Sequence, residues 1–315
     1  MNTLQLARDQ VRLPVFFPAV SSVKDDHDFA SYLELLTTLG ARTALTSAYD
    51  WSRIDGAARD KAMGRYVEWL DASTVMIMDS GRYEAYWHRD PTWSHEEYVA
   101  CALELWPSLA MSFDEPVSTD RADSQAATAA RAWERDQTAL GGIPVVPIVH
   151  SSPESVAAAV AAVAAAIHPL MIAVAERELG EGIVARTTTV RAIRHALDDQ
   201  GETCPIHLLG AGSPTSVLIY ALAGAESFDG LEWNRTVVDF ETARLHHRQH
   251  YDFFEHQTEA AGTGSHWGRT VAHNLIFWAA WMDRIRGGEG LGMVDLYVSA
   301  KGKQLLSAAL PELLR

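Results

Sequence analysis

Cysteine, positive charge and long apolar runs are all scarce in this sequence. Its two cysteines, Cys101 and Cys204, lie far apart, so they cannot form a closely spaced metal-binding or redox pair. Their scarcity favours a reduced, cytoplasmic compartment. Charges near the start leave no apolar core for a signal peptide. The longest apolar stretch, 156–167, falls short of the roughly 20 residues that cross a membrane, so we expect a buried helix there and no membrane contact.

Acidic residues outnumber basic ones by 41 to 26, and the formal net charge is −15. Proteins that bind nucleic acid usually present a basic surface, because phosphate contacts supply much of the affinity. The Arg- and His-rich stretch 235–250 is the main candidate for such a surface. The acidic balance slightly favours a small substrate, or a partner protein that supplies the basic surface.

Short apolar runs alternate with helix-like stretches along most of the chain. Strand–helix alternation predicts a parallel sheet with right-handed crossovers. Eight such units in 315 residues predict an α/β fold, a closed (β/α)8 TIM barrel. The predicted strands are 13–17, 43–47, 75–78, 109–113, 144–149, 170–174, 205–209 and 227–228. The predicted helices are 28–39, 57–70, 95–105, 123–140, 153–167, 188–200 and 214–223.

The alternation stops near the end of the chain, where aromatic residues accumulate. We expect one domain, with the barrel at about 10–235 and a C-terminal helical appendage at about 236–315. Residues 274–285 are expected to form an aromatic-rich helix. Amphipathic helices usually bury such faces, so these rings are expected in the core rather than on a base-stacking platform. The aromatic residues concerned are Trp233, Phe253, Phe254, Trp267, Phe277, Trp278 and Trp281.

Ionisable residues or glycine follow almost every later strand. In this fold the carboxyl ends of the strands form the active site. Several carboxylates at the mouth of one barrel repel one another when they are all charged. Their pKa values are therefore expected to spread apart. That arrangement suits a reaction in which one carboxylate attacks an anomeric carbon and another handles protons. The residues at the strand ends are Asp79, Asp114, His150, Glu176, Gly210 and Asp229.

Each strand end also has a purely structural interpretation. Asp79 and Asp114 are typical capping residues before a turn or helix. Ser213 and Pro214 begin a helix whose amino terminus suits a phosphate, but the same pair is simply good capping. The charged segment 176–181 is too polar for a buried turn unless its charges pair or bind something.

Six segments together resemble a known family. In chain order they are MDSGRYE, SFDEP, IVHSS, AVAERELGEG, HLLGAGSP and ESFDGLEW. They occur in the same order as matching motifs of tRNA-guanine transglycosylases, from about Val75 to Asp229. A weaker similarity lies in AHNLIFWAAWMDRIR, which resembles a helix where that family has a His-Asn pair.

The resemblance implies roles for three aspartates. Asp229 would be the nucleophile that displaces guanine and forms a covalent glycosyl–enzyme intermediate. Asp79 would transfer the proton and touch the base, and Asp114 would accept hydrogen bonds from the guanine edge. The incoming base would be a 7-deazaguanine such as preQ0, as in queuosine formation, and the configuration would be retained.

The resemblance also implies residues that hold or select the base. Tyr83 would stack on it, and His150 takes the place of a glutamine that contacts its carbonyl side. The pair Gly180–Glu181 matches the base-selecting turn. The full set of expected substrate-binding residues is Asp114, Ser80, Gly81, Tyr83, His150, Gly180, Glu181 and Gly210.

The likeness has clear departures. The family's zinc site uses three closely spaced cysteines and a later histidine, and only the histidine has a match here, His273. Histidines 246, 247, 250 and 256 would have to supply the other ligands. We therefore expect no metal and no other cofactor, and a solvated basic helix face in place of zinc. The family's Pro-Thr-Arg segment after the nucleophile, which grips tRNA phosphates, is replaced here by residues 232–235.

These departures leave the substrate open. The chain suits the DNA-directed branch of the family, a tRNA enzyme, or a relative that acts on a nucleoside or nucleotide. A non-catalytic subunit of a heteromeric transglycosylase and an ordinary glycoside hydrolase are further alternatives; Tyr83, Trp87 and Trp233 would suit the hydrolase as rim aromatics. Homodimers are common in the family, so a homodimer or a partner subunit is also left open.

Overall fold

Eight parallel strands form the centre of the molecule. The computed structural model describes residues 3–6, 9–23, 27–71, 74–114, 121–258 and 264–314. Neighbouring strands follow the order β7-β6-β5-β4-β3-β10-β9-β8. The strands are β3 (Val15–Val20), β4 (Thr43–Ser47), β5 (Val75–Asp79), β6 (Leu109–Met111), β7 (Val145–Val146), β8 (Ile172–Ala175), β9 (Ile206–Leu209) and β10 (Ser227–Gly230).

The two ends of this sheet meet just beyond β7. Ile148 forms a parallel bridge with Ala173 of β8. The Val149 amide donates to the Ala173 carbonyl at 2.9 Å, and the Ala173 amide donates to the Pro147 carbonyl at 2.9 Å. These bonds join the sheet edges, so the predicted (β/α)8 barrel is confirmed.

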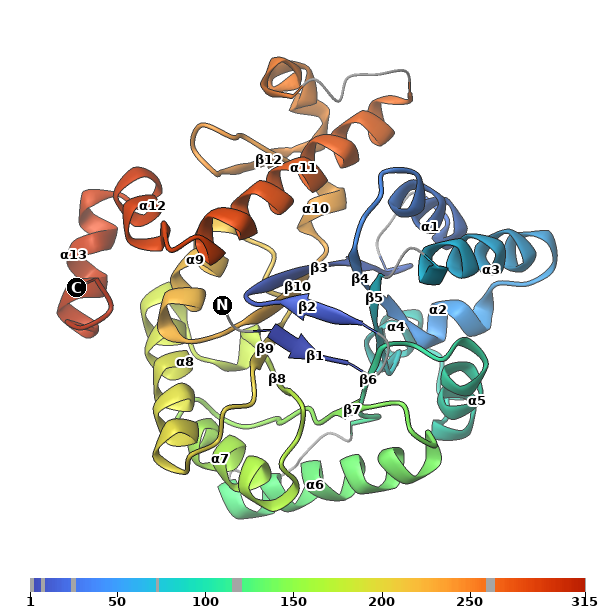
Figure 1. Cartoon of the computed structure of the whole chain (residues 1–315), viewed down its shortest axis with the longest axis horizontal. Coiled ribbons are helices and arrows are strands. Elements are labelled where there is room, and N and C mark those ends of the chain that lie inside the picture. Colours follow the sequence, from blue (N-terminus) through green and yellow to red (C-terminus); the bar gives the residue numbers. More distant parts are fainter. Residues whose placement is uncertain are drawn as a thin grey trace.

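Seven helices surround the barrel and confirm the predicted alternation (Figure 1). They are α1 (Phe29–Thr38), α3 (Gly56–Asp71), α5 (His95–Leu105), α6 (Ala122–Ala139), α7 (Val156–Ile167), α8 (Gly182–Asp199) and α9 (Pro214–Ala223). Two of them begin more than one residue from the predicted start: α8 at Gly182 rather than 188, and α7 at Val156 rather than 153. Helix α7 starts late because the Ser152 carbonyl accepts from residues 155 and 156 in a preceding turn.

Other local features differ from the prediction. Strand β3 was expected at 13–17 but starts at Val15, whose amide donates to the Glu226 carbonyl beside β10. Two short helices were not predicted: α2 (Ala48–Arg53) and α4 (Arg82–His88). Helix α2 follows β4 directly, and α4 begins three residues after β5.

An N-terminal hairpin covers the amino end of the barrel, and it too was not predicted. Strands β1 (Thr3–Gln5) and β2 (Gln10–Arg12) pair antiparallel and lie across the barrel (Figure 1). Leu4 and Val11 from the hairpin join the hydrophobic cluster inside the barrel, beside Phe17. This burial leaves the opposite, carboxyl end as the polar mouth.

The C-terminal segments pack on the outside of the barrel. They are α10 (Glu232–Arg235), β11 (Thr236–Val238), β12 (Leu245–His247), the 3-10 turns η2 (Arg248–Phe253) and η3 (Glu255–Gln257), α11 (His266–Arg286), α12 (Gly290–Tyr297) and α13 (Ala300–Ala309). Helix α11 is longer than the predicted 274–285. Its Trp278 stacks on Phe16 of β3 with ring centroids 3.8 Å apart.

The aromatic residues of this region mostly confirm the prediction that they belong to the core. Trp233, Phe277, Trp278 and Trp281 are all buried. Phe254 and Trp267 are only partly buried, and Phe253 contradicts the prediction, since it is 72% exposed. Among the helices that the structure describes, none combines the length and apolarity needed to cross a membrane.

A buried carboxylate fixes the segment between β6 and the mouth. Asp136 of α6 has no exposed surface. It accepts the Phe113 amide at 2.6 Å, the Arg135 Nε at 2.8 Å and the His95 Nε2 at 2.7 Å. Because Phe113 directly precedes Asp114, this network holds Asp114 in place.

We predict that Asp136→Ala lowers the free energy of unfolding by about 3 kcal/mol, because it leaves the buried Phe113 amide and the partly buried Arg135 without their partner. Glu134→Ala, an exposed site on the same helix, is the control and should change stability by less than about 0.5 kcal/mol. Urea denaturation of both variants measures the difference. Equal stability of the two would contradict the role given to Asp136.

Candidate active site

Three aspartates lie at the carboxyl end of the barrel. Asp79 ends β5, Asp229 lies in β10, and Asp114 follows β6 by three residues. Parallel strands place these positions at one end, as the sequence indicated. Both Asp114 and Asp229 act electrostatically on Asp79. Glu115, next to Asp114, lies outside the described residues.

Asp79 lies where ionisation of its carboxyl group is disfavoured. Burial raises its pKa well above the usual value, and the charges of Glu84, Asp114 and Asp229 raise it further. One hydrogen bond opposes this, from the Gly81 amide to Asp79 Oδ2 at 3.4 Å. Asp79 is therefore suited to hold a proton near neutral pH.

The turn after Asp79 packs closely against the backbone of Tyr49. Gly81 has a φ of +82°, and a Cβ at this position would lie 2.6 Å from the Cβ and the amide nitrogen of Tyr49. Only glycine fits here without moving the neighbouring backbone. Ser80 is anchored through its carbonyl, which accepts from Trp93 Nε1 at 3.0 Å, and its hydroxyl lies 3.4 Å from Asp114 Oδ1.

His150 lies between two carboxylates. Its Nε2 is 2.7 Å from Asp114 Oδ2, and its Nδ1 is 3.0 Å from Glu178 Oε1 in the turn η1 (Glu176–Glu178). Burial opposes a charged ring, but the hydrogen bonds to Asp114 and Glu178 outweigh it and raise the pKa of His150 to about 10. Burial also opposes ionisation of Asp114, yet its contact with His150 holds the pKa of Asp114 below the usual value.

This arrangement changes what His150 can contact. A charged imidazole donates from both nitrogens, and here both face carboxylates. No N–H remains for a base carbonyl in this geometry, so the ring orients Asp114 instead. Glu178 is the second carboxylate that contacts His150. The sequence indicated it only as part of a charged segment.

The other charged residues of the segment 176–181 either form hydrogen bonds and ion pairs with neighbouring helices or lie at the surface. Glu176 accepts from the Tyr220 hydroxyl at 2.8 Å and lies 2.7 Å from Arg186 Nη1. The Gly180 carbonyl accepts from Arg186 Nε at 2.9 Å. Glu181 is exposed at the start of α8. The segment thus places Glu178 in the mouth and leaves Glu181 at its surface.

Asp229 is held at one oxygen. Its Oδ1 accepts from the Gly210 amide at 3.0 Å and contacts His207 Nε2 at 3.2 Å. Asp229 itself is 7% exposed. His207 was missed in the sequence, although a histidine inside an otherwise apolar strand, Ile206–Leu209, is a signal that could have marked it.

Two further acids lie behind Asp79. Glu84 Oε1 accepts from the Ser21 hydroxyl at 2.6 Å, and Asp50 Oδ2 accepts from the Ser22 amide at 2.9 Å. Burial is the main cause that raises the pKa of Glu84 to about 7 and that of Asp50 to about 6. The sequence did not single out either residue, because both lie in short helices that were not predicted.

Exposed aromatic rings lie on α4, which begins three residues after Asp79. Tyr83 is on α4 and is 38% exposed. Its ring meets Trp87 edge-on with centroids 6.2 Å apart, and Trp87 meets Tyr86 at 5.7 Å. Tyr83 is thus available to a flat ligand.

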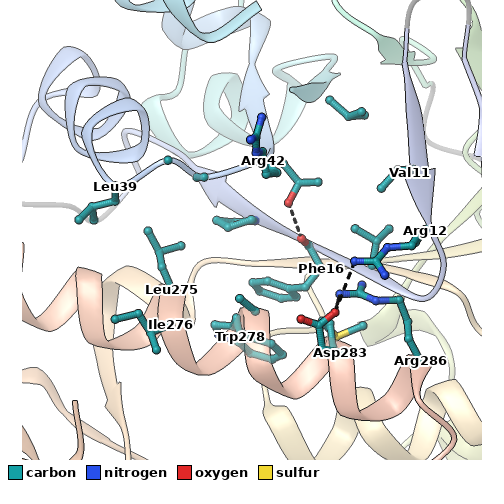
Figure 2. A pocket seen from close by; sticks show the side chains of 18 of the residues that line it. Val11, Arg12, Phe16, Leu39, Arg42, Leu275, Ile276, Trp278, Asp283 and Arg286 are labelled. Carbon is teal, nitrogen blue, oxygen red and sulfur yellow. Dashed lines mark hydrogen bonds and ion pairs between the residues drawn. The ribbon is translucent and has the colours of Figure 1, made fainter. Parts of the chain in front are cut away.

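A large cavity lies at the other end of the barrel. It has a volume of about 950 Å³ and includes Phe16, Trp278 and Arg286 in its lining (Figure 2). The first residues of β3, β4 and β5 also line it, whereas the aspartates follow the last residues of their strands. This cavity therefore does not serve the carboxylates.

The fold and the mouth define an α/β barrel with several interacting carboxyl groups at its carboxyl end. Residues 1–239 match the family model described as queuine tRNA-ribosyltransferase. The match covers most of the 315-residue chain, so the chain belongs to this family. It is therefore a glycosyltransferase-type enzyme of the kind that exchanges a guanine-type base. No curated protein matches the chain.

The residues present do not fit the zinc site that the family likeness implies. His273 is buried, its Nε2 donates to the Val238 carbonyl at 2.7 Å, and its Nδ1 lies 3.1 Å from the Thr258 hydroxyl. Neither ring nitrogen is left for a metal. Across the described ranges, no three His, Cys, Asp or Glu side chains are grouped to hold a metal ion. Cys101 and Cys204 belong to the barrel core.

We predict that the protein is stable without zinc. Removal of a structural zinc unfolds a domain that depends on it. Dialysis against EDTA should therefore leave Tm unchanged, and elemental analysis should find no stoichiometric zinc in protein purified without chelator. One zinc per chain together with a lower Tm after chelation would contradict this.

We predict a pH-dependent gain in stability for Glu84→Gln. The pKa of Glu84 rises from 4.5 to about 7 on folding. Between these values the folded protein keeps a proton that the unfolded chain has lost, so stability falls as pH rises. The variant escapes this loss and should gain up to about 3 kcal/mol over the unaltered protein between pH 5 and pH 8.

Denaturation curves at several pH values measure that gain. Glu134→Gln is the matched control, because Glu134 is exposed, and it should show the same pH profile as the unaltered protein. A stability difference for Glu84→Gln that does not change with pH would contradict the burial of an ionisable carboxyl group.

Proposed function

We propose that this enzyme exchanges guanine for a 7-deazaguanine base in a nucleic acid through a covalent aspartyl–glycosyl intermediate. Asp229 attacks C1′ of the nucleotide, and the bond from C1′ to N9 of guanine breaks. The bonding electron pair goes to N9, and Asp79 supplies a proton to the departing base. The 7-deazaguanine N9 then attacks C1′, the ester to Asp229 breaks, and the N9 proton goes to Asp79. Two displacements retain the configuration.

The observation that carries this proposal is the difference between the environments of the two aspartates. Asp79 is half-buried, and burial and the charges of Glu84, Asp114 and Asp229 raise its pKa and so favour its protonated form. Asp229 instead has its Oδ1 fixed by the Gly210 amide and by His207 Nε2. Paired acids whose environments differ in this way commonly divide the roles of proton donor and nucleophile.

Base recognition is assigned to Asp114. A carboxylate accepts the N1–H and the exocyclic amine of guanine. His150 and Glu178 keep Asp114 ionised and oriented, and Ser80 and Gly81 shape the turn beside it. Tyr83 is assigned to stack on the base, and Gly180 and Glu181 to the turn that selects the incoming base. Gly210 is assigned to hold Asp229 near the sugar.

A second candidate substrate is a free guanine nucleotide. The net charge of −15 favours it, because a long polyphosphate backbone is repelled by an acidic surface. The chemistry would be the same, so the choice between tRNA, DNA and nucleotide rests on which molecule takes up the base.

We predict that the protein transfers radiolabelled guanine or preQ0 into tRNA, DNA or GMP. Asp229→Asn should lower transfer by at least about 1000-fold and abolish the covalent adduct, since it removes the nucleophile. Asp79→Asn should lower transfer by about 100-fold, as expected for loss of a proton-transfer group. The exposed Asp60→Asn is the control and should keep full activity.

The three arms of this assay separate the candidates. Label in a polymer supports the nucleic-acid enzyme, and label in GMP alone supports the nucleotide enzyme. Release of free guanine without any transfer would indicate a hydrolase. No transfer into any of the three would overturn the proposed function.

A further inference from the structure

His207 is a buried histidine whose two nitrogens both contact the strand that carries Asp229. It lies in β9 and has no exposed surface. Its Nδ1 is 2.7 Å from the Ser227 hydroxyl, and its Nε2 is 3.2 Å from Asp229 Oδ1. Ser227 pairs with His207 in the register of β9 and β10. Ser227 and Asp229 are two residues apart, so both side chains project from the same face of β10.

The hydrogen bonds determine which nitrogen of His207 carries the proton. A carboxylate oxygen only accepts, so the contact with Asp229 requires a proton on Nε2. In that tautomer Nδ1 is an acceptor, and the Ser227 hydroxyl can donate to it. Ser227 is fully buried. The serine therefore fixes the tautomer that serves Asp229.

Both donors reach the same oxygen of Asp229. The Gly210 backbone amide donates to Oδ1, and His207 Nε2, from the neighbouring strand β9, contacts the same oxygen. Within the described part of the chain, no hydrogen bond to Oδ2 is found. Oδ1 is thus the anchored oxygen, and Oδ2 is the oxygen available for attack.

We propose that His207, fixed by Ser227, is a positioning residue that aims Asp229 Oδ2 at the anomeric carbon. This inference rests on the proposed function. The donors at Oδ1 orient the carboxylate before attack. They also stabilise the carboxylate when it leaves C1′ in the second displacement. Loss of His207 therefore slows breakdown of the adduct more than its formation, because a less stabilised carboxylate is a better nucleophile but a poorer leaving group.

The experiment compares the two displacements in single turnovers. The unaltered protein is first tested with tRNA, DNA and GMP. The molecule into which it transfers labelled guanine is then used as the probe. The rate of adduct formation is measured without free base, and the rate of adduct breakdown is measured after excess guanine is added. The ratio of these two rates does not depend on how much of the protein is folded.

We predict that His207→Met slows adduct breakdown by about 100-fold, the scale of losing a donor to a charged oxygen in an active site. Adduct formation should slow by about tenfold or less, so the covalent adduct accumulates. His207→Gln places an amide N–H near the position of Nε2 and should recover most of the breakdown rate. Ser227→Ala should show an intermediate loss, and the exposed His195→Gln should match the unaltered protein.

The outcomes distinguish this inference from the proposed function. If the unaltered protein forms no adduct, the proposed function fails. If it forms an adduct but His207→Met lowers both rates equally, the histidine has only a structural role and the inference is overturned. Failure of His207→Gln to restore breakdown, when His207→Met folds and binds the probe, would also overturn it.

Discussion

Burial of several carboxyl groups at one end of a closed barrel is the constraint on which this site depends. Parallel strands bring their carboxyl ends together, and this chain places Asp79, Asp114 and Asp229 there. Charged carboxylates cannot share a buried mouth without partners. Asp114 is paired with a charged His150, Asp229 is held by donors on Oδ1, and Asp79 has a raised pKa.

Two histidines give Asp114 and Asp229 hydrogen-bond partners. His150 couples Asp114 to Glu178, and His207 couples Asp229 to Ser227. Each ring is held by a second hydrogen bond, which sets the direction of the first. Among the described residues no histidine forms a hydrogen bond with Asp79, and its acidic neighbours favour the protonated carboxyl group instead. The three aspartates therefore differ through their surroundings, although they are chemically the same residue.

The appendage uses hydrogen bonds where the family likeness implies a metal. Asn274 of α11 donates to the Trp233 and Thr236 carbonyls and accepts from the Val238 amide. The neighbouring His273 donates to the Val238 carbonyl. The His-Asn pair thus joins α11 to β11 directly. Buried polar groups with complete hydrogen bonding can connect elements in this way without a ligand.

The sequence by itself determined the barrel and the polar residues at its strand ends, since strand–helix alternation and the position after each strand are local patterns. Asp79, Asp114 and Asp229 were found in this way. Only the tertiary structure decided which partner each one meets. His207 and Glu178 depend on the register and closure of neighbouring strands, and Glu84 on a short helix. Contacts between strands distant in sequence leave no local periodicity, so they emerge only when the barrel closes.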